Sequence, residues 1–225
     1  MSSWGNLLLQ EGASSLIESI LLFHDYIIIF LSSILFFVGW LFFYILSTRK
    51  INKYLIDLHI LELIWTLVPI LILLFIAYPS LYLLYLTESQ PATSITVKVI
   101  AHQWYWEYQY DTASNNKTFD SYINQPSSFG LRNLDVDNRM AIPSHLNSLL
   151  LISSADVLHC FTVPILGVKV DAVPGRLNYL TLSPNQAGIF YGQCRELCGR
   201  NHSYIPIVVE SISPADIINY MNISS

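Results

Sequence analysis

Hydrophobic residues are concentrated near the start of this chain, where they form two long runs. Residues 26–46 contain no charged side chain over 21 positions, and residues 63–86 form a second apolar run of 24 residues. An α-helix rises about 1.5 Å per residue, so either run is long enough to cross a hydrocarbon layer of about 30 Å. We predict two transmembrane helices, and we assign them with the N-terminal segment to a membrane anchor that covers residues 1–90.

Local signals predict the ends and the packing of these helices. Ser15 with Glu18 three positions later matches a capping box, which predicts a first helix that starts well before its apolar run, although this spacing also occurs by chance. The second run contains Pro69 and Pro79, which a membrane helix tolerates where a neighbouring helix satisfies the freed backbone groups. We therefore expect the second helix to be kinked and to pack against a partner.

The charges around the two runs predict their orientation. Arg49, Lys50 and Lys53 lie in the short link between the runs, whereas the segment before the first run carries only acidic charges. The positive-inside rule then places the link inside, with both chain ends and the C-terminal domain in the outer compartment. A cleaved signal peptide would start with basic residues and have a shorter apolar core. We therefore interpret the first run as a retained span.

From residue 94 onward the hydrophobic pattern changes to alternation. Apolar side chains occupy odd-numbered positions in residues 95–99 and even-numbered positions in residues 104–110. A period of two predicts β-strands, and the change of parity near His102 predicts a bulge or a turn between them.

Shorter apolar stretches predict further strands in the second half of the chain. They lie at 149–152, 177–182, 188–191 and 205–209, separated by Pro, Gly, Asn and Asp. No long amphipathic helix interrupts them, so we expect residues 91–225 to form an all-β sandwich or barrel. The Asn- and Ser-containing region 115–138 is interpreted as a long connection. Ser213, Pro214 and Asp216 predict a short helix near the end of the chain.

Composition supports this division and limits the possible functions. The chain is 53% hydrophobic and 12% charged, with a net charge of −5, and its 11 basic residues form no long basic run. This argues against nucleic acid as a partner, because phosphate binding needs clustered Lys and Arg. Residues 91–225 contain 10 acidic and 8 basic residues, a net charge of only −2, so any acidic docking surface must come from clustering.

One short segment carries the residues with the clearest chemistry. Cys194, Cys198 and His202 lie within nine residues, and Gly199 between them allows the loop to turn back tightly. His159, near the end of an earlier strand, would complete a set of two thiolates and two imidazoles. Such ligands select copper, zinc or iron–sulfur clusters and not magnesium or calcium. A structural zinc site and a disulfide between the two cysteines are the alternatives.

Four segments together resemble one known family. They are residues 194–202 (CRELCGRNH), 102–110 (HQWYWEYQY), 156–159 (DVLH) and 169–176 (KVDAVPGR). With the two-span hairpin, they make nearly the whole chain similar to mitochondrial cytochrome c oxidase subunit II. The resemblance implies a cupredoxin-like β-sandwich or barrel domain that follows a membrane α-helical hairpin. It also implies the mitochondrial inner membrane, with both termini and the β domain in the intermembrane space.

The resemblance assigns roles to the predicted metal ligands. Cys194 and Cys198 would bridge the two coppers of a copper A centre, His159 and His202 would each bind one copper, and the backbone carbonyl of Glu196 would be a weak further ligand. The side chain of Glu196 would bind magnesium at the border with the catalytic subunit, as a hard oxygen ligand for a hard cation. Two shared thiolates let one unpaired electron spread over both coppers, which suits electron transfer, whereas zinc has no redox chemistry.

The resemblance also implies roles outside the ligand set. Trp104 would receive the electron from cytochrome c through an exposed edge, although pattern alone favours core packing for this aromatic residue. Asp120, Asp137 and Asp156 would dock that basic partner in a salt-dependent way. From its spacing alone Asp156 is read as a surface carboxylate, with a partner of His159 as the alternative. Glu62 would lie at the mouth of a K-type proton pathway, with an interfacial anchor as its alternative.

The function implied is that of an electron-transfer subunit of the terminal respiratory oxidase. Such a subunit accepts electrons from cytochrome c and passes them to the haem-copper subunit I, where oxygen is reduced and protons are translocated. Its expected partners are subunit I, the other subunits, cytochrome c and the lipid membrane. A copper-free relative of the quinol-oxidase type would lack both thiolates, which are present here. A metal-storing or zinc-binding domain on a membrane anchor is the other alternative.

Two residues depart from the family pattern. Ile205 stands where the family has a methionine that binds one copper weakly, and isoleucine cannot act as a ligand. The chain contains 27 isoleucines and 3 methionines, and several mitochondrial codes read one isoleucine codon as methionine. We therefore hold as a hypothesis that Ile205 is a methionine misread with the wrong code. Cys160 is also unusual for the family, and we interpret it as a small buried residue.

Overall fold

A computed structural model describes most of the chain. The described residues are 9–48, 57–89, 91–111, 116–124 and 131–222. The chain divides into two compact units, one made of Met1–Glu18 with Glu88–Ser225 and one made of Ser19–Thr87. Arg49, Lys50 and Lys53, which carry the predicted orientation, lie outside the described residues.

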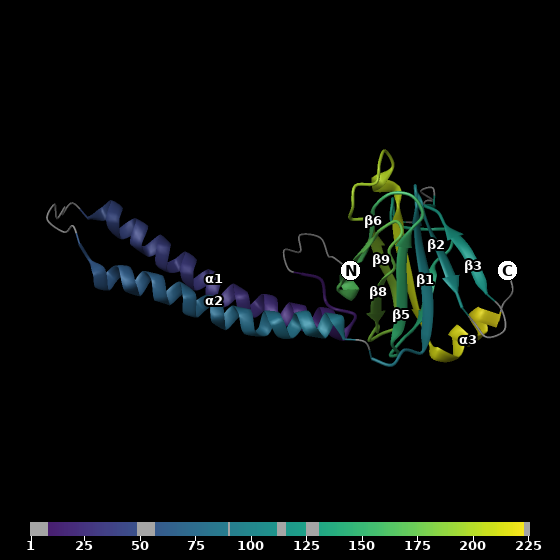
Figure 1. Cartoon of the computed structure of the whole chain (residues 1–225), viewed down its shortest axis with the longest axis horizontal. Helices are drawn as coiled ribbons and strands as arrows, with labels where there is room; N and C mark the ends of the chain where they lie inside the picture. Colours follow the sequence, from purple (N-terminus) through teal and green to yellow (C-terminus); the bar gives the residue numbers. More distant parts are fainter. Residues whose placement is uncertain (1–8, 49–56, 90, 112–115, 125–130, 223–225) are drawn as a thin grey trace. The chain divides into compact units, whose positions relative to one another are not determined.

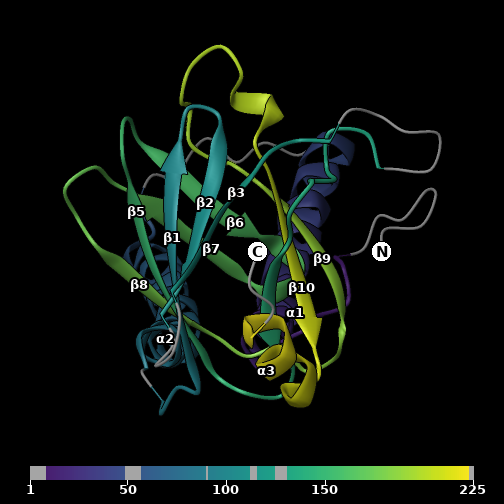
Figure 2. The same cartoon turned by 90° about the vertical axis from the view of Figure 1, so that its right-hand side faces the viewer.

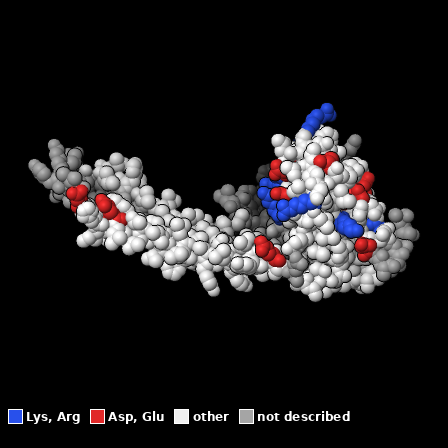
Figure 3. All heavy atoms as spheres, viewed as in Figure 1, with Lys and Arg blue, Asp and Glu red and all other residues white. Residues whose placement is uncertain are grey.

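The two predicted membrane helices are confirmed (Figure 1). α1 covers Ser15–Ser47 and α2 covers His59–Glu88, and both are long and apolar enough to cross a membrane. In Figure 3 the middle of this pair is uncharged, and acidic side chains lie only towards its ends. The Tyr26 hydroxyl of α1 donates a hydrogen bond of 3.1 Å to the carbonyl oxygen of Phe75 in α2. Pro79, four residues further on, has no N–H for that carbonyl, so α1 supplies the missing donor.

The cap of α1 differs from the prediction. Ser14 caps the helix, because its hydroxyl accepts a hydrogen bond of 3.3 Å from the N–H of Ile17. Ser15 is already the first helical residue, and the Glu18 carboxylate accepts a hydrogen bond of 2.9 Å from the side chain of Asn185. The predicted Ser15–Glu18 capping box is therefore wrong: Glu18 is drawn to a donor that is distant in the sequence.

The residues before and at the start of α1 are fastened to the β domain, and we call Ala13–Glu18 the N-terminal strap. Ala13 and Ser14 are buried. The Ala13 N–H donates to the carbonyl of Ile165 at 2.9 Å, and the Asn185 N–H donates to the carbonyl of Ala13 at 2.8 Å. The Ser14 hydroxyl donates to the carbonyl of Leu166 at 2.8 Å. Backbone groups that would need water are thus satisfied inside the domain.

The unit that contains Glu88–Ser225, here called the β domain, is built from strands arranged in two layers (Figure 2). The described residues form a five-stranded sheet in the order β3-β2-β1-β5-β8, a three-stranded sheet in the order β4-β10-β9, and the pair β6-β7. β6 lies beside β9, and β7 lies beside β5 and β8, so the pair closes one side between the larger sheets. The strands are β1 Ile95–His102, β2 Tyr105–Tyr110, β3 Lys117–Ser121, β4 Met140–Pro143, β5 Ser148–Ser154, β6 His159–Val163, β7 Val168–Ala172, β8 Asn178–Leu182, β9 Gly188–Gln193 and β10 Pro206–Ile212.

The predicted strands and the turn between the first two are present. β1 and β2 pair antiparallel from Val97 with Tyr110 to His102 with Tyr105, and Gln103 and Trp104 form the turn. The long connection predicted over residues 115–138 is wrong in part, because β3 lies within it and pairs antiparallel with β2. Its sequence, KTFDS, is too polar to signal a strand, and the pairing with β2 decides its structure.

The core lies between the two layers. The alternating apolar side chains of β1 and β2 point inward and are buried: Val97, Val99, Ala101, Trp106, Tyr108 and Tyr110. The Tyr110 hydroxyl donates to the carbonyl of Ala141 and accepts from its N–H, both at 2.8 Å. The predicted C-terminal helix is α3 (Pro214–Asn222), and its cap is Ser213, whose hydroxyl accepts from the Asp216 N–H at 3.2 Å.

Candidate metal centre

The two cysteines of the predicted site lie in the loop that follows β9. This loop, residues 194–201, leads into the 3-10 helix η2 (His202–Tyr204). Cys194 and Cys198 are 5% and 3% exposed, so the loop turns both side chains inward. Gly199 has a φ of +117°, a conformation that side-chain-bearing residues rarely adopt.

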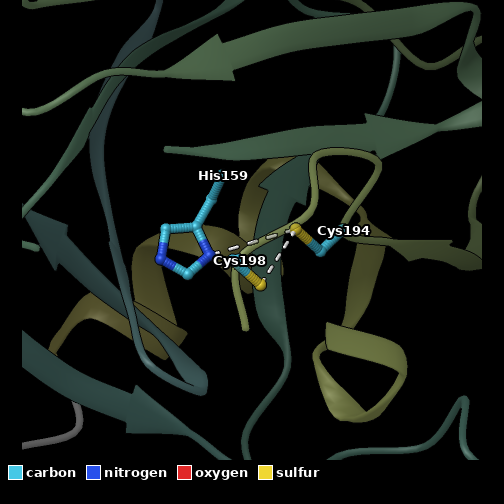
Figure 4. Close-up of side chains that lie close together, drawn as sticks. All are labelled: His159, Cys194 and Cys198. Atoms are coloured by element: carbon cyan, nitrogen blue, oxygen red, sulfur yellow. Dashed lines mark hydrogen bonds between the residues drawn. The ribbon is translucent and has the colours of Figure 1, made fainter. Parts of the chain in front are cut away.

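Each sulfur has its own imidazole. The two Sγ atoms are 4.0 Å apart. The Nδ1 of His159 lies 3.9 Å from the sulfur of Cys194, and the Nδ1 of His202 lies 3.5 Å from the sulfur of Cys198. Figure 4 shows three of these side chains, His159, Cys194 and Cys198, pointing toward one another. A disulfide has its sulfurs about 2.0 Å apart, so the disulfide alternative is not what the structure contains, and both thiols are free.

His159 reaches this point because β6 and β9 lie very close together. A Cβ atom added to Gly192 of β9 would lie 3.0 Å from the carbonyl carbon of Thr162 in β6, and closer still to its oxygen. Only a residue without a side chain permits this approach. Since His159 begins β6 and Cys194 directly follows β9, the same approach brings the two donors together.

The other ring nitrogen of His159 is held by Asp156. The Nε2 of the fully buried His159 lies 2.9 Å from Oδ1 of Asp156, whose carboxylate also accepts from the N–H groups of Val157 and Gln103, each at 2.6 Å. Burial raises the pKa of Asp156, but these hydrogen bonds outweigh it and lower the pKa below its usual value. The reading of Asp156 as a plain surface carboxylate is therefore wrong, because it fixes the ring so that Nδ1 faces the sulfurs.

The two thiols are electrostatically unequal. Burial raises the pKa of Cys194, but hydrogen bonds with His159 and with the backbone of Cys160 and Glu196 outweigh it, and the pKa falls below that of an ordinary thiol. Burial and the neighbouring Cys194 both raise the pKa of Cys198. One thiolate thus forms readily, whereas the second requires a cation that displaces its proton.

Two further residues of the loop region lie as follows. The backbone carbonyl of Glu196 is 3.3 Å from the sulfur of Cys194, while the residue as a whole is exposed. Ile205 is 1% exposed and packs in the core, and its carbonyl accepts a hydrogen bond of 3.2 Å from the N–H of Cys194. Cys160 is fully buried as predicted, 3.3 Å from the hydroxyl of Thr162, and burial raises its pKa to about 11.

The aromatic stretch contributes two tryptophans. Trp104 is half-buried, and its indole N–H donates to the carbonyl of Cys198 at 3.3 Å, so it both packs on the core and keeps part of its surface in water. Trp106 is fully buried, and its ring meets that of His159 at 6.2 Å with an angle of 62°. Trp106 was not predicted to belong to the site, although it lies two residues from Trp104 on the same parity.

The remaining predicted residues lie elsewhere in the described chain. Asp120 is in β3, and Asp137 accepts a hydrogen bond of 2.8 Å from the Tyr122 N–H. Glu62 lies in the first turn of α2, 3.7 Å from His59, and belongs to the helical unit. None of the contacts described for these three carboxylates involves the cysteine loop.

Comparison with known proteins decides the family. Residues 95–212 match the family described as cytochrome C oxidase subunit II, periplasmic domain, and residues 2–83 match its transmembrane domain. The chain belongs to the cytochrome c oxidase subunit II family. It is 49% identical to cytochrome c oxidase subunit 2 of Drosophila lowei over 215 residues, 94% of this chain and 93% of that one. With the Drosophila simulans subunit it shares 47% over 225 residues, 99% of this chain and 98% of that one.

Solved structures of the same subunit agree with the fold. The periplasmic domain of subunit II from Bradyrhizobium japonicum is 38% identical, with a TM-score of 0.54 over 58% of this chain and 92% of that one. Subunit II in a mixed disulfide with a thioredoxin-like protein is 36% identical, with a TM-score of 0.52 over 59% of this chain and 91% of that one. The β domain is therefore cupredoxin-like, and the chain is a subunit of cytochrome c oxidase that works together with other subunits. Its His159, Cys194 and Cys198 cluster is compatible with copper.

Proposed function

We propose that this chain is the subunit through which electrons from cytochrome c reach subunit I of the oxidase. In this proposal it holds a dinuclear copper A centre, with Cys194 and Cys198 as bridging ligands and His159 and His202 as terminal ones. The observation that carries it is the pairing of each sulfur with a separate imidazole, at 3.9 and 3.5 Å, around a sulfur–sulfur distance of 4.0 Å.

The same arrangement favours two metal ions over one. The donor atoms of His159, Cys194 and Cys198 all lie within 4.8 Å of one another, but His202 is not part of that group, and its Nδ1 lies 3.5 Å from the sulfur of Cys198. A structural zinc ion needs four donors about 2.0–2.3 Å from one point. Two ions, each beside one imidazole and both beside the sulfurs, account for all four donors. A copper pair there would supply reversible one-electron chemistry.

The protein residues would keep the site dry and rigid and give it a route to the surface. Asp156 orients His159, and the ring of Trp106 packs against the imidazole in an edge-on contact. Trp104 links the loop of residues 194–201 to the surface, because its indole N–H donates a hydrogen bond to the Cys198 carbonyl. This contact supports a role for Trp104 in receiving electrons from cytochrome c. We propose that three carboxylates dock that partner: Asp120, Asp137 and the exposed part of Asp156.

We also propose a location and further residue roles by analogy with the family. The insect relatives support the mitochondrial inner membrane, crossed by α1 and α2 within the lipid, with both termini and the β domain in the intermembrane space. Glu62 at the start of α2 is proposed as the mouth of a proton pathway, and the exposed carboxylate of Glu196 as a magnesium ligand at the border with subunit I. The domain boundary is proposed at residue 90.

Metal analysis with an EPR spectrum tests this function. The full chain, purified and loaded with copper, is expected to hold two coppers that share one unpaired electron. Cys198→Ser should abolish that signal, because it removes a bridging thiolate. Cys160→Ser is the matched control, because Cys160 is also buried but its sulfur lies 3.3 Å from the hydroxyl of Thr162. This variant should keep the signal. Zinc in the site, or no signal in the oxidised wild type, would rule the proposal out.

A further inference from the structure

The four donors lie in, or directly after, two loops that belong to different parts of the β domain. His159 follows the loop of residues 155–158 after β5, a strand of the five-stranded sheet. Cys194 and Cys198 belong to the loop after β9, a strand of the three-stranded sheet, and His202 begins η2 directly after that loop. The approach of β6 and β9 sets the spacing of His159 and Cys194, whereas the arrangement of the two irregular loops also depends on contacts that join them.

The turn between β1 and β2 contacts both of these loops. The backbone N–H of Gln103 donates to Oδ2 of Asp156 at 2.6 Å, and Oδ1 of the same carboxylate lies 2.9 Å from His159. The side-chain amide of Gln103 donates to the carbonyl of Cys198 at 2.8 Å. One residue thus touches the support of a histidine ligand and the backbone of a cysteine ligand.

The cysteine loop is shaped to lie against this turn. A Cβ atom on Gly199 would be 3.2 Å from Nε2 of Gln103 and 3.3 Å from Cζ2 of Trp104, tighter than nearly all real contacts of this kind. The turn itself is stiff, because the rings of His102 and Tyr105 on either side of it stack at 4.5 Å with an angle of 2°.

We propose that Gln103 is a positioning residue that braces the two ligand-bearing loops against each other. Its backbone holds the Asp156–His159 pair and its side chain holds the peptide after Cys198, so the two halves of the donor set keep their spacing in the absence of metal. This inference rests on the proposed copper function, because the brace matters for a centre that needs donors from both loops. Hydrogen bonds that orient metal ligands in this way typically change metal affinity by about 10- to 100-fold when they are removed.

The test compares two isosteric substitutions in the full chain. Gln103→Met keeps the length of the side chain and the backbone N–H but removes the donor to Cys198. Gln109→Met in β2 is the matched control, since the amide of Gln109 donates at 2.7 Å to Glu107, outside both loops. Gln103→Glu, which keeps the shape but replaces the donor by an acceptor, is a second variant expected to act like Gln103→Met.

Copper retention and metal-free exchange are the two measurements. After challenge with excess chelator, Gln103→Met should lose copper about tenfold faster than the wild type, and Gln109→Met should not. In the metal-free chain, amide hydrogens of residues 199–202 should exchange faster in Gln103→Met, while those of β1 and β2 stay protected.

The outcomes separate the brace from other roles. If Gln103→Met changes neither copper retention nor amide exchange, the proposal is overturned. The same holds if only the KM for cytochrome c rises, because that change would make Gln103 a docking residue and not a brace. Equal copper loss in Gln109→Met would overturn it as well. Should the wild type hold no copper pair, the proposed function fails, and the exchange measurement still decides whether Gln103 braces the loops.

Discussion

Replacing Gly192 with alanine tests whether the close approach of β6 and β9 builds the metal centre. The added methyl group would lie 2.9 Å from Cγ2 of Val163 and 3.0 Å from the carbonyl carbon of Thr162, and nearer still to the carbonyl oxygen. Backbone atoms cannot rotate away as a side chain can, so the two strands must separate. His159 and Cys194 sit at the ends of these strands with their donor atoms 3.9 Å apart, and they would separate too.

The size of the effect follows from two opposing contributions. Overpacking a well-filled interior costs about 1–3 kcal/mol, and the reduced freedom of the unfolded chain on Gly to Ala substitution returns about 0.4–1 kcal/mol. We expect Gly192→Ala to lower the free energy of unfolding by about 1–2 kcal/mol. A preorganised site tolerates a displacement of only about 0.5 Å, so copper should also dissociate faster than from the wild type.

Denaturant unfolding of the full chain in detergent, followed by tryptophan fluorescence, measures the first effect, and chelator challenge measures the second. Gly39→Ala in α1 is the control, because a Cβ there meets nothing within 4 Å; it should not lower the free energy of unfolding, since alanine favours a helix over glycine, and it should leave copper dissociation unchanged. If Gly192→Ala unfolds at the same denaturant concentration as the wild type and keeps its copper, the reasoning about Gly192 is wrong. The close approach of β6 and β9 would then not be needed for the metal centre.

Two further predictions concern the buried hydroxyl of Tyr110 and the identity of Ile205, which stands where the family has a methionine. Tyr110→Phe should lower the free energy of unfolding by about 1–3 kcal/mol, because it removes the buried hydroxyl that serves both backbone groups of Ala141; Tyr179→Phe, at a residue that is 49% exposed, should change little in the same denaturation assay. If Ile205 is a misread methionine, mass spectrometry of a peptide that spans it, taken from the native organelle, should give the methionine mass, and the isoleucine mass would end that hypothesis.

The sequence predicted the elements whose hydrophobic period is clear. Two charge-free runs gave α1 and α2, and the change of parity near His102 gave the turn between β1 and β2. β6 was missed because all five of its residues are buried, so a strand with both faces covered shows no alternation. β3 was missed because its polar sequence becomes a strand only through pairing with β2.

The metal donors of the candidate site could be predicted from the sequence, but the residues that support them could not. The spacing of Cys194, Cys198 and His202 and the motif around His159 gave the four donors, and the structure brings them together. The supports of the site could not be predicted, because Gln103 contacts residues that are 53 and 95 positions away. No local pattern encodes such pairings, since they arise only when the two sheets close.

The N-terminal strap imposes an order of events on the synthesis of this protein. Ser14 is made before the β domain, but its hydroxyl bonds the carbonyl of Leu166, which is 152 residues further along. The chain leaves the β unit at Glu18 and returns to it at Glu88, so the hairpin must cross the membrane an even number of times. The strap must therefore reach the side of the membrane that holds the β domain before that domain can finish folding around it. Loss of either span would leave the strap and its binding place on opposite sides of the membrane.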